Sequence, residues 1–115
     1  MKLIIAIVQP SRLEAVKAAL TEVDVFRLTV MDCQGFGRQK GQTAMYRGVE
    51  YKTNLLRKVA LEIVVNDDFL ERTIDVISSV ARTGSEGNIG DGKIFVLPAE
   101  DAVQIGGTER GPEAI

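Results

Sequence analysis

The chain has 115 residues with a formal net charge of −2, and 45% of them are hydrophobic and 26% charged. This length fits a single globular domain with one core, and the balance of residues excludes a disordered chain. Without a long run of Lys or Arg, the charge argues against a nucleic-acid or membrane-surface partner held by electrostatics.

Alternation and helical spacing of apolar residues predict the elements of the first third. Residues 3–8 form a buried strand, residues 11–23 a helix, and the segment from residue 26 towards residue 35 a second strand. Ser11 followed by Glu14 predicts a capping box at the start of the helix. Cys33, the only cysteine, is expected to be a small buried hydrophobe, and its isolation favours the reducing cytoplasm.

Residues 37–54 change character, with glycines, polar groups and both tyrosines but neither helical nor strand periodicity. A connection this long inside a compact domain is uncommon and usually functional. We therefore predict a long projecting loop between two strands.

The rest of the chain predicts a strand over residues 58–65, a helix capped by residues 66–68 and a strand over residues 94–97. Leu70, Ile74, Ile77 and Val80 mark the apolar face of that helix, and Gly84 is expected to end it. A glycine-rich loop follows at residues 84–93, and a C-terminal tail occupies residues 103–115.

The predicted order is β-α-β-β-α-β within one domain covering residues 1–115, an α+β class that a ferredoxin-like sheet with two helices on one face satisfies. Because Ile, Val and Leu occupy both faces of several strands, the face without helices needs covering. Self-association is the expected solution.

The residue types exclude most catalytic chemistry. There is no histidine, which removes the commonest general base and metal ligand, and a single cysteine makes zinc improbable on chemical grounds. Asp67 and Asp68 read as helix-capping charges rather than an acid–base pair.

The second glycine-rich loop has the Walker A spacing from Gly87 to Lys93, but Ile94 replaces the Ser or Thr that binds Mg²⁺ and a strand follows instead of a helix. This excludes a P-loop NTPase. Capture of phosphate by backbone N–H groups and Lys93 remains possible, and a tight turn before a strand is the alternative.

Two motifs together carry a family resemblance. The stretch from Gly35 to Tyr51 (GFGRQKGQTAMYRGVEY) and the stretch from Ile89 to Val96 (IGDGKIFV) resemble the PII nitrogen-regulatory signal-transduction family, and the similarity extends over essentially the whole chain. The resemblance implies a homotrimer that is a regulator and not an enzyme, with three clefts between subunits in which ATP and ADP compete. It also implies that 2-oxoglutarate joins through Mg²⁺ when ATP is bound.

Site residues are carried over by matching position. The resemblance implies nucleotide contacts from Ile7, Thr29, Gly35, Phe36, Gly37, Arg38, Gln39, Glu62, Val64, Ile89, Gly90, Asp91, Gly92 and Lys93. Thr29, Glu62 and Val64 would meet the adenine from the adjacent subunit, while residues 90–93 grip the phosphates. Gln39 would help to coordinate Mg²⁺ and Lys58 would pair with 2-oxoglutarate.

The long loop, called the T-loop in the family, implies the output. Partners of the family include ammonium transporters and enzymes of nitrogen assimilation, and Tyr51 matches a tyrosine that is uridylylated in some members. A loop that changes shape with ligand suits a sensor.

Two departures keep an alternative open. Residues 85–88 make the second loop about three residues longer than the family pattern, and Gln104 and Gly106 stand where the family usually carries two phosphate-binding arginines. The alternative is a divergent PII-like sensor that prefers ADP or AMP and answers another effector, such as bicarbonate, in carbon metabolism. An acyl-phosphate hydrolase using Arg38 and Gln39, and a purely structural trimer, are the other classes considered.

Overall fold

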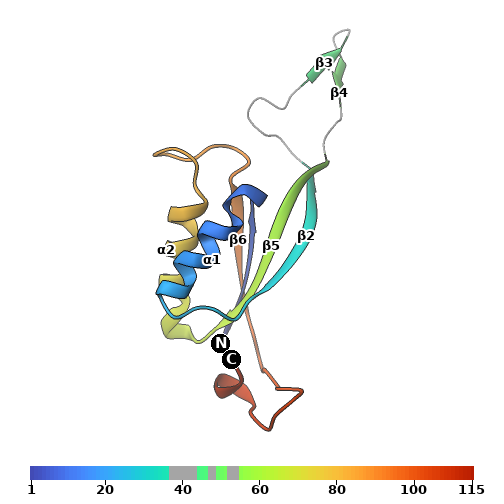
Figure 1. Ribbon diagram of the computed structural model, residues 1–115. Coiled ribbons are helices and arrows are strands. Elements are labelled where there is room, and N and C mark those ends of the chain that lie inside the picture. Colours follow the sequence, from blue (N-terminus) through green and yellow to red (C-terminus); the bar gives the residue numbers. More distant parts are fainter. Residues whose placement is uncertain (37–43, 47–48, 52–54) are drawn as a thin grey trace.

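The computed structural model describes residues 1–36, 44–46, 49–51 and 55–115 (Figure 1). The elements are β1 (Lys2–Val8), η1 (Pro10–Arg12), α1 (Leu13–Glu22), β2 (Thr29–Phe36), β3 (Ala44–Tyr46), β4 (Val49–Tyr51), β5 (Leu55–Val65), η2 (Asp67–Phe69), α2 (Leu70–Ala81), β6 (Gly92–Pro98) and η3 (Gly111–Ala114). The η elements are single 3₁₀ turns.

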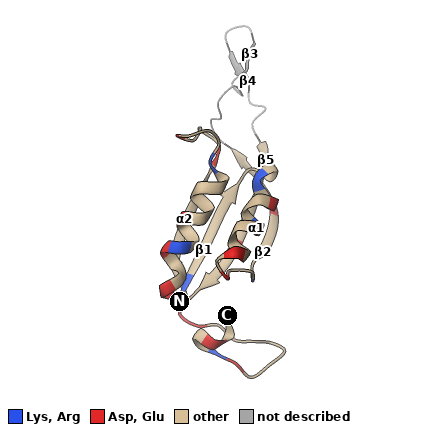
Figure 2. Ribbon diagram, turned by 60° about the vertical axis from the view of Figure 1, so that its left-hand side comes forward, with Lys and Arg blue, Asp and Glu red and all other residues tan. Residues whose placement is uncertain are grey.

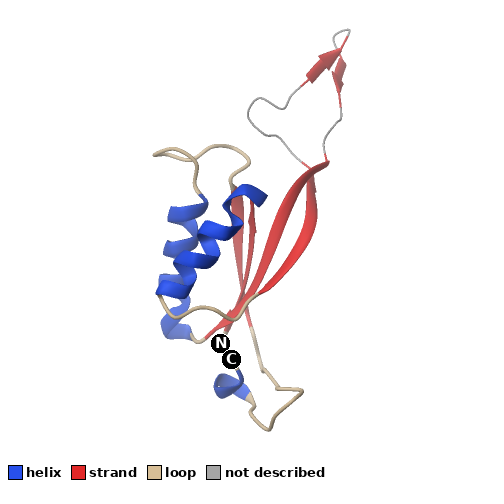
Figure 3. Ribbon diagram, in the orientation of Figure 1, coloured by secondary structure: helices blue, strands red, loops and turns tan. Residues whose placement is uncertain are grey.

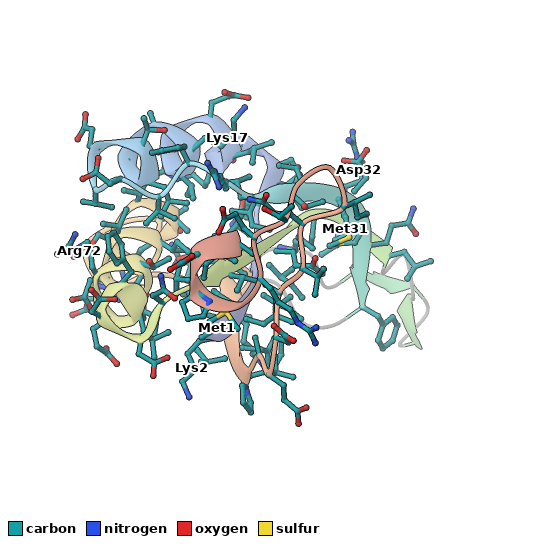
Figure 4. All side chains as sticks on the ribbon, turned by 90° about the horizontal axis from the view of Figure 1, so that it is seen from below. Met1, Lys2, Lys17, Met31, Asp32 and Arg72 are labelled. Carbon is teal, nitrogen blue, oxygen red and sulfur yellow. The ribbon has the colours of Figure 1, made fainter. Side chains whose placement is uncertain are left out.

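The main sheet has four strands in the order β2-β5-β1-β6, and every neighbouring pair is antiparallel. Both helices lie against one face of this sheet (Figure 3). Figure 4, seen from below, shows Lys17 on α1 and Arg72 on α2 at some distance from Met31 and Asp32, which lie on the edge strand β2. The ferredoxin-like α+β fold predicted from the sequence is therefore confirmed.

The core lies between the helices and the two central strands. Ile4, Ala6 and Val8 of β1 stand directly opposite Ile63, Leu61 and Val59 of β5, and all six are buried. Val16 and Leu20 of α1 and Ile77 of α2 cover them. Because side chains alternate across a strand, this pairing sends the residues between them to the opposite face.

That opposite face, here called the open face, carries no helix. It presents Leu3, Ile5 and Ile7 of β1, Met31 of β2 and Phe95 and Leu97 of β6. Met31, Phe95 and Leu97 are exposed to 40%, 47% and 41%. Apolar residues gathered on one sheet face are typical of an interaction surface, and they agree with the apolar pattern from which self-association was predicted.

Both predicted helix caps are wrong. Within the described residues, no side chain caps either helix, and Glu14 contacts Lys17 instead of reaching back to the backbone. Each helix is entered through a 3₁₀ turn, so that backbone contacts such as the one from the Arg12 N–H to the Gln9 carbonyl (2.9 Å) satisfy its first turn.

The end of α2 also differs from the prediction. The helix ends at Ala81 and leaves through an extended Arg82, so Gly84, at φ +72°, lies two residues beyond the cap. The Arg12 side chain donates to the Val80 carbonyl, one of the last carbonyl groups of α2, which have no partner within the helix. A turn at Gly84 was expected to provide such a partner.

Several strand boundaries differ from those predicted from the sequence. β5 and β6 are longer than predicted, and β2 begins at Thr29 rather than residue 26. Residues 37–54 contain a two-stranded antiparallel pair, β3–β4, where no strand was predicted. Figure 1 shows β3 and β4 beyond the ends of β2 and β5. Cys33 is half-buried on the open face instead of lying in the core.

Charges of both signs are interspersed on the two helices (Figure 2). No helix in the described part of the chain is long and apolar enough to cross a membrane.

Candidate functional site

The loop between α2 and β6 closes against the first strand at Gly92. This glycine has φ +127°, and a Cβ placed on it would lie 1.9 Å from the Ile7 carbonyl oxygen. An L side chain fits neither the dihedral angle nor the space. The sequence motif therefore has a physical basis, because only glycine lets the loop turn into β6 this close to β1.

The carboxylate of Asp91 lies at the centre of the same loop. It accepts hydrogen bonds from the Thr83 N–H at 2.9 Å, the Thr83 hydroxyl at 2.6 Å, the Asn88 N–H at 2.8 Å and the Gln9 amide at 3.3 Å. Asn88 in turn donates through its side chain to the Thr83 hydroxyl at 2.8 Å. The loop is thus held by side-chain contacts on its inner side.

These contacts shift the acidity of Asp91. Partial desolvation alone raises the pKa of its carboxyl, but the hydrogen bonds from Thr83 and Asn88, with the positive charge of Lys58, together lower the pKa below its ordinary value of 3.8. The group is held as a carboxylate.

Lys58 approaches the loop from the sheet. Its ammonium group donates to the Gly90 carbonyl at 2.6 Å, and its stem passes Gly35, where an added Cβ would lie 3.4 Å from the Lys58 Cγ. On β1 and β6, Ile7 stands directly opposite Lys93. The structure therefore brings Ile7, Gly35, Lys58 and residues 90–93 together at one end of the sheet, which we call the loop end.

The residues predicted to meet adenine form a second group. Thr29 on β2 lies directly opposite Glu62 on β5, and both line a hollow of about 380 Å³ together with Val64. Ala114 and Ile115 from the C-terminal segment complete one wall of that hollow. Thr29, Glu62 and Val64 thus lie on one surface, which we call the hollow end.

The two groups do not meet within one chain. Lys58 and Glu62 are both on the open face of β5, but they are four positions apart along the strand, roughly 13 Å. In Figure 1 the loop between α2 and β6 lies towards β3–β4, whereas the termini lie at the other end of the sheet. The two groups therefore lie at opposite ends of the sheet.

Gly37, Arg38 and Gln39 lie outside the described residues, so their predicted roles are unchanged. Tyr51 is described only through its backbone in β4, where it pairs with Ala44. Phe36 and Ile89 are exposed to 69% and 61%. Among the described residues, no group of three His, Cys, Asp or Glu side chains could hold a metal ion.

Sequence reasoning missed Gln9, Thr83 and Asn88, which contact Asp91. Thr83 and Asn88 are residue types that commonly bond nearby backbone in turns, and that signal was available. Gln9 is 82 positions from Asp91, and nothing local in the sequence indicates that contact. A groove of about 260 Å³ between α2 and β6, lined by Ser78, Arg82 and Asp91 among others, was likewise unforeseen.

The C-terminal segment shows what stands in place of two expected arginines. The Gln104 N–H donates to the Glu109 carbonyl at 3.1 Å, and Gly106 is fully open, with nothing within 4 Å of an added Cβ. The Arg110 side chain donates to Asp101 at 2.7 Å. Within one chain, Arg110 is therefore held by a carboxylate rather than directed to the loop end.

Comparison with known proteins decides the family. The model of the family described as nitrogen regulatory protein P-II matches residues 1–109. The chain belongs to the P-II family. It is 52% identical to the nitrogen regulatory protein GlnK1 of Methanosarcina mazei over 115 residues, covering 100% of this chain and 97% of that protein. Nitrogen regulatory protein P-II of Azospirillum brasilense is 50% identical, with both chains covered completely.

A third relative, nitrogen regulatory protein P-II of Rhodospirillum rubrum, is 49% identical over the same length. All three are named as regulatory proteins. The resemblance drawn from the two motifs is confirmed, and this P-II protein is a nitrogen regulator rather than an enzyme.

Proposed function

We propose that this P-II protein senses adenine nucleotides in clefts between the subunits of a homotrimer and passes the state of each cleft to a partner through residues 37–54. The observation that carries the proposal is the separation of the two residue groups on the open face. The loop end and the hollow end belong to one sheet but do not meet within one chain, and a second copy packed on the open face would bring the loop end of one chain beside the hollow end of the other.

The loop end has the chemistry for phosphate. Gly90 and Gly92 have positive φ and small volume, which lets a ligand approach the backbone closely. Lys58 and Lys93 add positive charge on the open face. A cation beside backbone N–H donors is a recurrent arrangement for phosphate groups.

The hollow end has the chemistry for a purine base. Val64 offers an apolar contact, while the Thr29 hydroxyl and the Glu62 carboxylate can pair with ring nitrogens and an exocyclic amine. The pairing of β2 with β5 fixes the positions of these side chains relative to one another, because Thr29 lies directly opposite Glu62. A flat base lying along the strands would meet all three.

The proposed effector, 2-oxoglutarate, would bind at the loop end. Lys58 would pair with a carboxylate of 2-oxoglutarate, and Gln39 would contribute an oxygen to Mg²⁺ bound by ATP and 2-oxoglutarate. Gln39 would help to hold Mg²⁺, whose positive charge would allow a carboxylate to bind beside the phosphates. This arrangement makes 2-oxoglutarate binding depend on the triphosphate.

The output is proposed to be regulation of a nitrogen-assimilation enzyme or an ammonium transporter in the cytoplasm. Residues 37–54 follow β2 directly and lead into β5, the two strands that carry Thr29 and Lys58. Ligand contacts at either strand could therefore bias the conformation of the segment between them. Uridylylation of Tyr51 would act on the same segment.

A divergent sensor that prefers ADP or AMP, with an effector such as bicarbonate, is a second candidate. The observation favouring it is that Gln104 and Gly106 lack positive charge and Arg110 is held by Asp101. Fewer charged contacts lower the affinity for a triphosphate more than for a monophosphate.

Subunit complementation tests whether the site lies between chains. Lys93→Glu should abolish phosphate binding at the loop end, and Thr29→Trp should block the space for the base at the hollow end. Both positions are exposed on the folded chain. Neither homotrimer should bind ADP. Co-expressed at equal amounts, the two variants should recover about a quarter of the wild-type sites, because every mixed ring contains one intact junction.

A site within one chain gives a different result. In that case each variant lacks its site whatever its neighbour, and the mixture binds no ADP at all. That outcome, or a monomer by sedimentation, would contradict the proposal.

A further inference from the structure

The four hydrogen bonds to Asp91 are divided between its two carboxylate oxygens. Oδ1 accepts from the Gln9 amide and the Thr83 hydroxyl, and Oδ2 accepts from the N–H groups of Thr83 and Asn88. All four partners donate, so the site needs a group that only accepts. An ionised carboxylate is such a group, whereas an amide would turn an NH₂ towards two of the donors.

Asn88 adds a second tie across the same loop. Its side-chain amide donates to the Thr83 hydroxyl at 2.8 Å and to the Thr83 carbonyl at 3.2 Å. Thr83, Asn88 and Asp91 thus close residues 83–91 into a ring of mutual hydrogen bonds. Residues 84–87 form the outer part of this ring, with Gly84 and Gly87 at positive φ and Ser85 and Glu86 exposed.

This ring lies immediately before the glycines of the loop end. Asp91 stands between Gly90, whose carbonyl is bonded by Lys58, and Gly92, which packs on the Ile7 carbonyl. The position of both glycines therefore depends on where the Asp91 side chain is held. Of the extra residues of the loop, Asn88 takes part in the ring, and Ser85 and Glu86 are exposed on its outer part.

We propose that Thr83, Asn88 and Asp91 form a clamp that fixes the loop in its ligand-ready shape before a nucleotide arrives. Asp91 is then a positioning residue whose carboxylate faces the loop and makes no contact with phosphate. The role of the clamp in binding rests on the proposed nucleotide function, whereas its effect on the order of the loop does not depend on any ligand.

Electrostatics favour this arrangement over direct contact. A carboxylate turned to a phosphate would repel it, and the cost is large where water is partly excluded. Turned inward, the same charge strengthens each hydrogen bond that it accepts. The lowered pKa of Asp91 agrees with a carboxylate held by donors.

Preorganisation is the benefit to binding. A loop that is ordered before the ligand arrives does not lose that conformational entropy on binding, so affinity rises without a new contact. Opening the clamp should therefore weaken nucleotide binding and loosen the free loop together, while the core between α1, α2 and the sheet stays intact.

The test uses Asp91→Asn and Thr83→Val, with Thr83→Ser as the conservative variant and Ser85→Ala as a matched control in the same loop. Amide hydrogen exchange of residues 83–93 is measured on the nucleotide-free protein, and ADP affinity is measured by calorimetry. Asp91→Asn and Thr83→Val should speed exchange and weaken ADP binding about fivefold or more, the effect of one or two lost hydrogen bonds. Thr83→Ser and Ser85→Ala should remain near wild type in both.

Two results would overturn the clamp. Weaker ADP binding by Asp91→Asn with unchanged loop exchange would mean that the carboxylate meets the ligand directly. Faster exchange with unchanged affinity would mean that loop order does not serve binding. If the wild-type protein itself bound no nucleotide, the proposed function would fail, and the exchange rates would still decide whether the clamp holds the loop.

Discussion

The ammonium group of Lys58 donates a hydrogen bond to the Gly90 carbonyl at 2.6 Å. This contact joins the open face of β5 to the glycine-rich loop before β6. The residue proposed to bind 2-oxoglutarate is therefore also one that holds the proposed phosphate loop. An organic acid that draws Lys58 away from Gly90 would change the loop, which gives the two ligands a physical means of coupling.

Replacing Lys58 should affect nucleotide binding even when 2-oxoglutarate is absent. Lys58→Met removes a positive charge and the contact to Gly90, and we expect ADP affinity to fall about tenfold, as for a lost charge-assisted bond. Calorimetry with ADP alone measures this. Lys58→Arg, which keeps the charge, should lose less, and unchanged ADP affinity in Lys58→Met would show that the lysine serves the organic acid only.

Gly92→Ala should destabilise the fold. A Cβ at this position would lie 1.9 Å from the Ile7 carbonyl oxygen, and the residue has φ +127°. We expect the free energy of unfolding to fall by about 2 kcal/mol or more, in the range of strained-backbone substitutions. Denaturant unfolding measures it, and Gly106→Ala, at a position with open space, is the control that should change little.

Arginine at positions 104 and 106 should strengthen triphosphate binding. Each new charge-assisted phosphate contact is worth roughly 1.5–3 kcal/mol, so Gln104→Arg with Gly106→Arg should raise ATP affinity tenfold or more. Adenosine, which has no phosphate, should bind as before. If ATP affinity did not rise, the missing arginines would not explain nucleotide preference.

The hydrogen bonds to Asp91 should weaken in acid. Because the folded-state pKa of Asp91 lies below its ordinary value of 3.8, the unfolded chain takes up the proton first. The stabilisation is present in full above that value and is lost as the pH falls through the folded pKa. The difference in unfolding free energy between wild type and Asp91→Asn should therefore narrow from pH 6 to pH 3.

Asp101 does not disturb that comparison. A hydrogen bond from the Arg110 side chain is the main cause that lowers the pKa of Asp101, but both proteins contain this pair, so its contribution cancels. A difference that stayed constant across the same range would contradict the role given to the Asp91 carboxylate.

The fold could be predicted because burial repeats along the strands. Val59, Leu61, Ile63 and Val65 are buried on β5, and of the residues between them Glu62 is exposed, Val64 is half-buried and the small Ala60 is buried as well. Apolar residues at every second position are visible in sequence. The helix entries could not be predicted, because the choice between a side-chain cap and a 3₁₀ turn such as Pro10–Arg12 depends on how the chain leaves the strand. The β3–β4 pair has three residues in each strand, too short for a periodic signal.

The candidate site residues could be named from the sequence, but their contacts could not. Gly92 and Lys93 are marked by the motif, whereas the pairing of Thr29 with Glu62 is seen only in the structure. The Gln9 contact to Asp91 joins residues that only the β1–β6 pairing brings together. Side-chain contacts of this range depend on the folded backbone and leave no local pattern in sequence.

Calorimetric titration of the protein with ATP, ADP and AMP, each with and without Mg²⁺ and 2-oxoglutarate, decides whether it is a nucleotide sensor. We expect adenine nucleotides to bind and 2-oxoglutarate to bind only together with Mg-ATP. Binding of ADP or AMP without any response to 2-oxoglutarate would favour the divergent sensor. Absence of nucleotide binding under every condition would show that the protein does not sense adenine nucleotides.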